Sequence, residues 1–332
     1  MILVTGATGH IGNVLVRKLL EQGRKVRALI WRGDDTSSLQ GLDVEQVEGD
    51  VLDPQSLETA FQGVDTVYHL AGVISIMPGQ NPLVWQVNVD GTRNILEAAR
   101  QARIRRLVYT SSIHAIARAP HGVWINESLP FDPNNPYGAY DRSKATASLE
   151  VQKAAREGLD AVIVCPTGVI GPFDFRGSEM GEVIFNAATT KTMFYIEGAY
   201  DFVDVRDVVD GMIAAGEKGN PGESYILSGH KLSVRYLLET VREVTGRAFA
   251  SVKIPFSLAK FIAWVAPWYY LRSRKKPRFT PYSLEVLQSN ADIDHAKASR
   301  ELGYHPRPLI ETIADTVKWF REYRKQYSPK KL

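Results

Sequence analysis

Three glycines near the start of the chain, Gly6, Gly9 and Gly12, restrict its fold more than any other feature. They lie between an apolar run, Ile2–Val4, and an amphipathic segment, Ile11–Glu21, and so form a turn from a predicted strand into a predicted helix. Glycine allows a tight turn at the first position, close approach of a phosphate group at the second and close helix packing at the third. Because helix N-termini attract anions, this loop predicts a dinucleotide-binding site.

The first half of the chain continues this alternation of short apolar runs and helical periodicity. Further strands are predicted at Val26–Ile30, Val44–Val47, Thr66–Leu70, Leu107–Tyr109 and Ala161–Val164, and a helix between them at Val87–Arg100. Strands that alternate with helices form a parallel sheet covered on both faces, and right-handed crossovers make the sheet doubly wound. The sequence therefore predicts an α/β Rossmann domain over residues 1–170, to which elements around residues 200–230 return.

The chain beyond Pro166 differs in composition, because prolines divide it into shorter pieces. Helical patterning is clearest at Val205–Ala215, Val234–Val244 and Leu309–Tyr323. We therefore expect residues 171–332 to form mainly a smaller, mostly helical lobe that binds the substrate.

Composition and charge argue against several classes of function. The chain has 332 residues, 44% of them hydrophobic, and its net charge of +3 comes from 40 basic and 37 acidic residues, so no global field favours nucleic acid. No two histidines have helical ligand spacing, and we expect no metal site. A single cysteine, Cys165, and a start that leads directly into a strand predict a cytoplasmic location.

Tyr140 and Lys144 stand one helical turn apart and suit proton transfer. A free tyrosine has a pKa near 10, and a lysine on the same helix face is expected to lower the pKa of Tyr140. Ser112 follows a predicted strand and would hydrogen-bond the same substrate oxygen, with Ser111 as the less favoured candidate. Such a Tyr and Lys pair also occurs by chance, but the carboxyl end of a strand is where these sheets bind ligands.

These motifs together resemble the short-chain dehydrogenase/reductase superfamily. The resemblance lies in Thr5-Gly-x-x-Gly-x-x-Gly12 and in Tyr140-x-x-x-Lys144. The chain length, the Gly171-Pro172 pair and Asp201-Phe-Val-Asp-Val-Arg-Asp207 resemble the extended group, the NAD-dependent epimerase/dehydratase superfamily. The run Pro-Thr-x-Val-x-Gly-Pro is similar to the dihydroflavonol 4-reductase and 3β-hydroxysteroid dehydrogenase branch. The resemblance implies an NAD(P)-dependent oxidoreductase and a homodimer.

The same resemblance implies a set of cofactor contacts at the carboxyl ends of the strands. Besides Gly6, Gly9 and Gly12, the set comprises Thr8, His10, Ile11, Asp50, Val51, Leu70, Ala71, Gly72, Asn88, Thr110, Tyr140, Lys144, Pro166 and Val169. Within this set, Lys144 would hold the nicotinamide ribose.

The end of the second predicted strand bears on the choice between the two nicotinamide cofactors. An acid there would bind the ribose 2′-hydroxyl of NAD, but the sequence runs from Ala28 to Gly33 with no acid before Asp34. Arg32, twenty residues after Gly12, carries a guanidinium that suits a 2′-phosphate. We expect NADP in preference to NAD; the alternative for Arg32 is a solvated loop cation.

Side chains near the predicted centre indicate the class of substrate. We expect Ser112, His114, Tyr137 and Phe173 beside the substrate. Sugar-nucleotide members of the family often have Arg-Asp-Phe where this chain has Tyr200-Asp-Phe, and that change removes an obvious ligand for a diphosphate. The sequence therefore favours an apolar ketone, aldehyde or alcohol, flavonoid-like or steroid-like.

A nearly all-apolar segment, residues 255–271, is followed by arginines and lysines up to residue 278. Lys260 and Pro267 interrupt the segment, so it would make a poor transmembrane helix. We favour a helix that roofs an apolar substrate pocket, because helices of a folded lobe bury one face. The other interpretation is a weak contact with the surface of an anionic membrane.

Three functions follow from these observations. The leading hypothesis is NADP-dependent transfer of a hydride to or from a small apolar substrate, with Tyr140 as general acid and base. The second is an epimerase or dehydratase that acts on a sugar nucleotide and holds NAD tightly. The third is a non-catalytic regulator that senses dinucleotide, which has no need for the complete set of Ser112, Tyr140 and Lys144.

Overall fold

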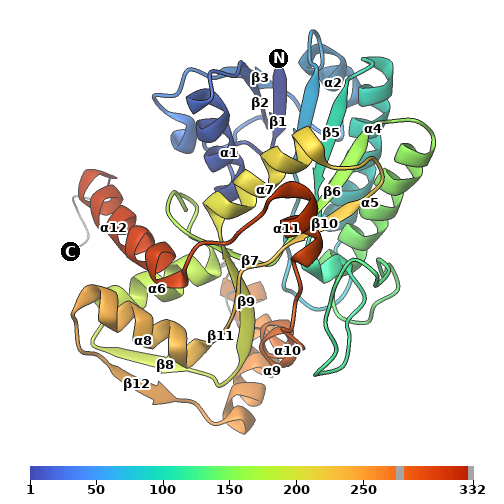
Figure 1. Ribbon diagram of the computed structural model, residues 1–332. Helices are drawn as coiled ribbons and strands as arrows, with labels where there is room; N and C mark the ends of the chain where they lie inside the picture. The colour runs from blue at the N-terminus through green and yellow to red at the C-terminus, as the bar shows by residue number, and fades with distance from the viewer. Residues whose placement is uncertain (274–279, 328–332) are drawn as a thin grey trace.

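The computed structural model describes residues 1–273 and 280–327, and its centre is a seven-stranded parallel sheet (Figure 1). The strands lie in the order β10-β6-β5-β4-β1-β2-β3. Their bounds are β1 Ile2–Thr5, β2 Val26–Ile30, β3 Glu45–Glu48, β4 Thr66–His69, β5 Arg106–Thr110, β6 Ala161–Pro166 and β10 Ser224–Leu227. The doubly wound α/β fold predicted from the sequence is confirmed.

Helices cover both faces of this sheet, and each face has its own apolar core. One face is covered by α1 His10–Glu21, α7 Val205–Lys218 and α11 Ala296–Leu302; the other by α2 Pro54–Ala60, α4 Gly91–Gln101 and α5 Ala139–Arg156. Alternate strand residues point to opposite cores, as Leu3 and Val4 do in β1. Because both faces are covered, every residue of the central strands β4 and β5 is buried.

The chain enters α4 through irregular helix. A short helix, α3 Pro82–Trp85, continues into a π-helical turn at Gln86–Asp90 before α4 begins at Gly91. The sequence predicted one regular helix over Val87–Arg100, because apolar periodicity does not distinguish a π turn from an α turn. Short 3-10 turns also occur at Ser37–Leu39 and Ile113–Ala115.

The lobe below the sheet in Figure 1 combines helices with short strands. A small sheet has the order β11-β9-β7, and β8 pairs with β12. The strands are β7 Gly168–Ile170, β8 Thr192–Tyr195, β9 Ala199–Asp204, β11 His230–Ser233 and β12 Ala250–Lys253. The helices are α6 Glu179–Thr189, α8 Val234–Thr245, α9 Phe256–Ser273, α10 Pro281–Gln288 and α12 Leu309–Tyr327. We had not predicted these strands, because runs of three to six residues carry little periodicity.

Helix α9 differs from the pocket roof that the sequence favoured. Its small residues Ala259 and Ala263 are buried against Leu284 of α10, whereas Trp264 and Trp268 are 68% and 74% exposed. Its largest side chains therefore do not line an internal pocket. The cations expected at residues 274–278 lie outside the described residues.

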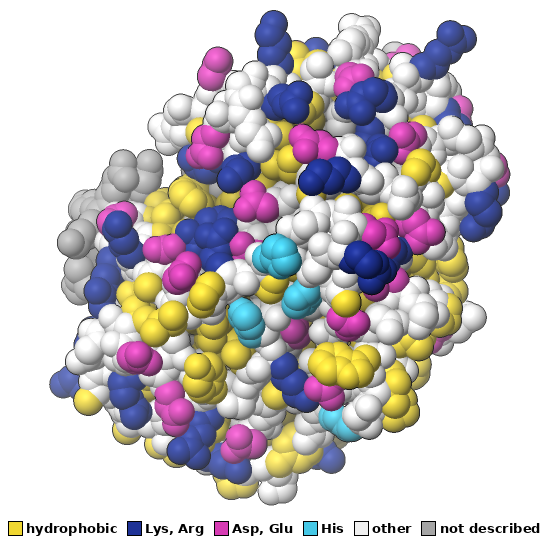
Figure 2. Space-filling view, in the orientation of Figure 1, with side chains coloured by type: hydrophobic (Ala, Val, Ile, Leu, Met, Phe, Trp, Pro, Cys, Tyr) yellow, Lys and Arg dark blue, Asp and Glu magenta, His cyan; other side chains and the backbone are white. Residues whose placement is uncertain are grey.

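The surface bears charges of both signs. In Figure 2, basic and acidic side chains are interspersed over the visible face and no large area of one sign appears. Among the described residues, no helix combines the length and the apolar character needed to cross a bilayer.

Candidate active site

The glycine turn joins β1 to α1 and is too tightly packed for side chains. Gly6 has a positive φ of 67°, and a Cβ atom there would lie 2.8 Å from the backbone nitrogen of Ala71. A Cβ on Gly12 would lie 2.1 Å from the carbonyl oxygen of Gly6. The first turn of α1 contains no acidic residue, and its N-cap, Gly9, offers no side-chain oxygen to the helix amides. This cradle fits the phosphates of a dinucleotide.

A buried polar network fixes the ends of β1 and β4 beside that turn. The Thr5 hydroxyl lies 2.7 Å from Nδ1 of His69 and accepts hydrogen bonds from the backbone amides of Leu70 and Ala71. Burial lowers the pKa of His69 to about 3, so its ring is neutral. The network orients Leu70, Ala71 and Gly72, the segment in which we predicted cofactor contacts.

Asn88 holds this segment against α5. Its side-chain oxygen accepts from the amide of Val73 at 2.8 Å, and its nitrogen donates to the carbonyl oxygen of Val73 and to the Ser143 hydroxyl at 2.9 Å. Asn88 is fully buried, so in this structure both ends of its amide are occupied by the protein. In this structure Asn88 therefore positions Gly72. A Cβ atom on Gly72 would lie 3.5 Å from Nζ of Lys144.

Ser112, Tyr140 and Lys144 meet at the carboxyl end of β5. A hydrogen bond from Ser112 reaches the Tyr140 phenol, and the Ser112 hydroxyl accepts from the amide of His114 at 3.2 Å. Nζ of Lys144 donates to the carbonyl oxygen of Thr110 at 2.7 Å. Ser111 points elsewhere and shares a hydrogen bond with Ser148 at 2.7 Å, which agrees with the preference for Ser112.

The pKa of Tyr140 differs from the expectation. Burial raises it to about 12, although the hydrogen bond from Ser112 opposes the rise. We expected Lys144 to lower it, but the lysine amine is directed to the backbone of Thr110 and lies 3.4 Å from the Tyr109 hydroxyl. Burial also lowers the pKa of Lys144 to about 8. At neutral pH Tyr140 is therefore a protonated phenol, and the phenolate that would act as a base is scarce.

Aromatic side chains from three distant segments surround this centre. Nε2 of His114 lies 2.8 Å from the Tyr200 hydroxyl of β9, and the two rings stack with centroids 5.8 Å apart. The ring of Tyr282, from α10, is 5.9 Å from that of His114. Burial, and then Arg118, lower the pKa of His114 to about 3. Neutral aromatic groups therefore form this wall.

A second polar cluster adjoins the wall on the side of α5. Asp141 is buried, accepts a hydrogen bond from Tyr282 at 2.7 Å and lies 3.6 Å from Arg118. Burial raises its pKa to about 6, while Tyr282 and Arg118 oppose the rise. The Arg118 guanidinium stacks on Tyr137, with its central carbon 3.4 Å from the ring centroid. The ring of Tyr137 is thus covered by this cation, and its place beside the substrate stays a prediction.

A loop of the lobe closes over the glycine turn. Arg176 donates to the Thr8 hydroxyl at 2.7 Å and pairs with Asp34 at 2.5 Å, and Thr8 also donates to Asp34 at 2.5 Å. Nε2 of His10 lies 2.9 Å from the carbonyl oxygen of Pro172. Arg32 points away from this cluster, is 87% exposed and has only a loose ion pair of 3.7 Å with Glu48.

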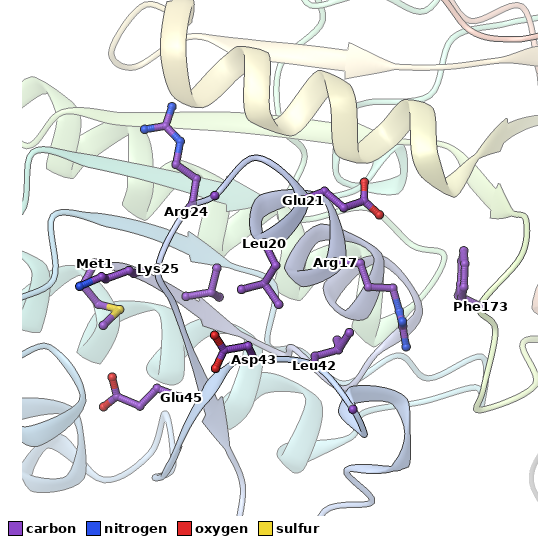
Figure 3. A pocket seen from close by; sticks show the side chains of 13 residues that line it. Met1, Arg17, Leu20, Glu21, Arg24, Lys25, Leu42, Asp43, Glu45 and Phe173 are labelled. Atoms are coloured by element: carbon purple, nitrogen blue, oxygen red, sulfur yellow. The ribbon is translucent and has the colours of Figure 1, made fainter.

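Phe173 does not join the aromatic wall. It has a positive φ of 66°, its ring lies 5.0 Å from the Arg17 guanidinium, and it faces Trp319 of α12. It lines a groove of about 620 Å³ beside α1, which Figure 3 shows with Arg17 near Phe173 and Met1 at the other end. The groove contains none of Ser112, Tyr140 or Lys144. The positive φ of Phe173 turns its side chain toward α12, and the spacing of residues in the sequence does not reveal such a backbone angle.

The other predicted cofactor residues lie at the ends of strands. Val51 is buried after β3 against Gly91, and Asp50 beside it accepts from the amide of Leu52 at 2.9 Å. Pro166 ends β6 and Val169 lies in β7. Ile11 is in the first turn of α1. Groups of metal-ligating residues are absent from the described part of the chain.

The sequence analysis did not identify Arg176, Tyr282, Asp141 or Arg118 as site residues. It used Tyr200 only as a position at which sugar-nucleotide members of the family often have arginine. Tyr200 carried a usable signal, because a phenol there replaces the charge that a diphosphate would need. The others carried none. Arg176 and Tyr282 reach the site from segments more than one hundred residues away from their partners.

Comparisons with known proteins agree with this geometry. Residues 2–228 match the NAD dependent epimerase/dehydratase family. The chain is 40% identical over 322 residues to the sterol demethylase protein B of Methylococcus capsulatus, covering 96% of this chain and 98% of that protein. It is 34% identical to a Synechocystis protein named as a dihydroflavonol 4-reductase, covering 96% and 94%. The crystal structure of gox2253 superimposes with a TM-score of 0.83 at 32% identity, covering 97% and 98%.

Proposed function

Because the chain belongs to the NAD dependent epimerase/dehydratase family of oxidoreductases, we propose that it transfers a hydride between NADP(H) and an apolar carbonyl compound or alcohol. The observation that carries this proposal is the convergence of Ser112, Tyr140 and Lys144 at the carboxyl end of β5, where Lys144 is anchored on the carbonyl oxygen of Thr110 at 2.7 Å. That end of a doubly wound sheet is where ligands bind.

The proposed reduction adds one hydride and one proton to a carbonyl group. The hydride would come from a reduced nicotinamide cofactor held at the glycine turn and by Lys144. Tyr140 gives its phenolic proton to the carbonyl oxygen, which becomes the product hydroxyl, and the phenolate then takes a proton from solvent. Ser112 accepts from the His114 amide, and in the proposed step its own proton turns from Tyr140 to the developing oxyanion.

Lys144 supplies positive charge and orientation to this step. Its amine is anchored on the carbonyl oxygen of Thr110 at 2.7 Å, beside Gly72, where the resemblance puts the nicotinamide ribose. With a pKa of about 8, it is mostly protonated at neutral pH. The reverse reaction needs a Tyr140 phenolate, and Lys144 would favour that charged form only by turning its amine from Thr110 toward Tyr140.

An apolar, ring-shaped substrate suits the wall of this site. His114, Tyr200 and Tyr282 present neutral rings, and Arg118 is already engaged by Asp141 and Tyr137. A sugar diphosphate would require cations at these positions. The names of the relatives, a sterol demethylase protein and a dihydroflavonol reductase, also support a polycyclic alcohol or ketone.

Two arginines support the preference for NADP. Arg176 borders the glycine turn through Thr8, and Arg32 follows β2 with its guanidinium exposed. Asp34, which would favour the ribose hydroxyls of NAD, is occupied by Arg176 and Thr8. A 2′-phosphate at Arg32 would gain charge-assisted hydrogen bonds, and Arg176 would add positive charge beside the glycine turn.

Oxidation of NADPH in the presence of apolar cyclic ketones tests the proposed function. Replacement of Tyr140 by Phe removes the donated proton, and we expect kcat to fall at least about 100-fold with NADPH affinity unchanged. Tyr236→Phe, at a tyrosine of α8 that is 54% exposed, is the matched control and should keep full turnover. If Tyr140→Phe retained the wild-type kcat, the assigned proton transfer would be wrong.

The same preparation distinguishes the alternative functions. Retention of NAD through gel filtration, together with conversion of a sugar nucleotide and no net consumption of NADPH, would identify an epimerase or dehydratase. Binding of NADPH with turnover of neither class of substrate would identify a dinucleotide-sensing regulator.

A further inference from the structure

Helix α9 carries a broad apolar face on the outside of the lobe. Seven of its large apolar side chains are 40% to 74% exposed. They are Leu258, Phe261, Ile262, Trp264, Val265, Trp268 and Tyr269. At about 100° per residue these positions occupy one arc of about 160°. We call this surface the α9 face.

The pattern of burial in α9 is the reverse of that in an ordinary surface helix. Such a helix buries its large apolar residues and exposes polar ones, whereas α9 buries Ala259 and Ala263 and exposes Trp264 and Trp268. Exposed indole rings side by side are costly in water, because fully burying one large apolar side chain gains about 1.5–3 kcal/mol. An apolar surface of this kind marks a contact with another molecule or a membrane.

The neighbouring strand pair extends the α9 face. Phe194 of β8 is paired with Val252 of β12, and both are exposed, at 65% and 43%. Ile196 and Ile254, two residues further along each chain segment, pack with α9. Since side chains two residues apart share a face of a strand, Phe194 and Val252 lie on the α9 side of the pair.

The charges of α9 are all positive. The segment Phe256–Ser273 contains no acidic residue, and its cations are Lys260, at the edge of the apolar arc, and Arg272, in the last turn. Both side chains are exposed, and Nζ of Lys260 lies 4.9 Å from the Phe256 ring centroid. Tryptophan and tyrosine favour the boundary between hydrocarbon and water, and bordering cations favour anionic headgroups.

We propose that the α9 face docks on the surface of a bilayer that contains anionic lipid. Trp264, Trp268 and Phe261 enter the boundary between headgroups and acyl chains, and Lys260 and Arg272 contact lipid phosphates. Pro267 lies inside the helix, which carries no spanning segment, so α9 lies along the interface. The charges select lipid over a second copy of the chain, since two α9 faces would bring like charges together.

The α9 face is adjacent to the candidate active site. Ala259 and Ala263 pack on Leu284 of α10. The same helix provides Tyr282, which lies beside His114 and hydrogen-bonds Asp141. Docking through α9 therefore holds this side of the site against the lipid, from which an apolar substrate would enter. The route of the substrate rests on the proposed function, whereas lipid docking does not.

Flotation of the full-length chain with vesicles tests the proposal. We expect binding to vesicles that contain phosphatidylglycerol, weaker binding to phosphatidylcholine alone, and a shift of tryptophan emission to shorter wavelength. The double variant Trp264→Gln/Trp268→Gln should bind at least about tenfold more weakly, since the loss of about 1.4 kcal/mol is tenfold. Trp31→Gln, at a tryptophan after β2 that is 60% exposed, is the matched control and should bind vesicles like the wild type.

Three results would overturn lipid docking. One is absence of the wild-type chain from the vesicle fraction. Another is equal flotation of the double variant and the wild type. The third is a dimer in light scattering that the double variant converts to a monomer, with no vesicle binding by either, which would identify a second copy as the occupant. NADPH affinity of the double variant, measured without vesicles, should stay at the wild-type value and separates this test from that of the reaction.

Discussion

Tyr140 and Asp141 are consecutive residues of α5 whose acidities are both set by burial. The pKa of Tyr140 rises to about 12 and that of Asp141 to about 6, because the surroundings disfavour the charged form of each. Ser112 opposes the rise for the phenol, while Tyr282 and Arg118 oppose it for the carboxyl group. At the scale of single residues, burial therefore keeps the Tyr140 phenol protonated at neutral pH and brings the pKa of Asp141 to just below neutrality.

Asp141 should make stability depend on pH. Its folded pKa of about 6 lies above the ordinary value of 3.8, so the folded state holds the proton more tightly than the unfolded state. The free energy of unfolding should therefore fall as pH rises from about 4 to about 6.5, by up to about 3 kcal/mol. Urea titrations at several pH values measure this decrease.

An Asp141→Asn variant isolates that contribution. It keeps an acceptor for Tyr282 but does not titrate, so the decrease with pH should be smaller by the same amount. Asp90→Asn, at a carboxylate that is 44% exposed, serves as the control and should follow the wild-type curve. Parallel curves for wild type and Asp141→Asn would contradict the buried titration.

At the scale of elements, the contact of α1 with the glycine turn decides how closely a phosphate can approach. A Cβ on Gly12 would lie 2.1 Å from the backbone oxygen of Gly6, and one on Gly9 would lie 3.3 Å from the same atom. The first overlap cannot be relieved without moving the helix, whereas the second needs only a small adjustment. Gly12 is thus needed for the packing of α1 on the turn, whereas Gly9 is the position at which a phosphate can approach the backbone.

Alanine substitutions should show that separation. Gly12→Ala should lower the free energy of unfolding by about 1–3 kcal/mol and also weaken NADPH binding. Gly9→Ala should change stability much less, because its φ of −72° suits alanine, yet weaken NADPH binding by filling the space for a phosphate. Thermal unfolding and equilibrium binding measure both effects. Full NADPH affinity in Gly9→Ala would show that no phosphate approaches this position.

At the scale of the whole molecule, the lobe and the sheet domain meet across the glycine turn. Arg176, in the loop between β7 and α6, bridges to Thr8 and to Asp34, and Pro172 contacts His10. The cofactor loop is therefore framed by both parts of the chain. Cofactor preference then depends on residues from both parts.

Removal of either arginine should reduce NADPH affinity more than NADH affinity. We expect Arg176→Ala and Arg32→Ala each to weaken NADPH by about tenfold, because each variant removes positive charge that would favour the 2′-phosphate. Arg24→Ala, which loses only an exposed ion pair of 3.6 Å with Glu217, is the control. Calorimetric titration with both cofactors measures the difference. Equal losses for NADPH and NADH would refute the preference for NADP.

Much of the fold could be predicted because it rests on short-range patterns. The predicted strand at Val26–Ile30 has the bounds of β2, and predicted Ile11–Glu21 is α1 without its first residue. The π turn at Gln86–Asp90 and the short strands of the lobe were not predictable, since neither produces a distinct apolar period over so few residues.

The sequence by itself determined the doubly wound sheet, the glycine turn and the adjacency of Tyr140 and Lys144, because contiguous residues encode strand alternation, helical turns and backbone freedom. Only the tertiary structure decided that Arg176 reaches Asp34 across 142 residues and Tyr282 reaches Asp141 across 141. It also decided that Lys144 turns to the Thr110 backbone and that α9 directs its tryptophans outward. Each of these contacts depends on how separate elements pack against one another. Such packing produces no periodic pattern in the sequence around the residues in contact.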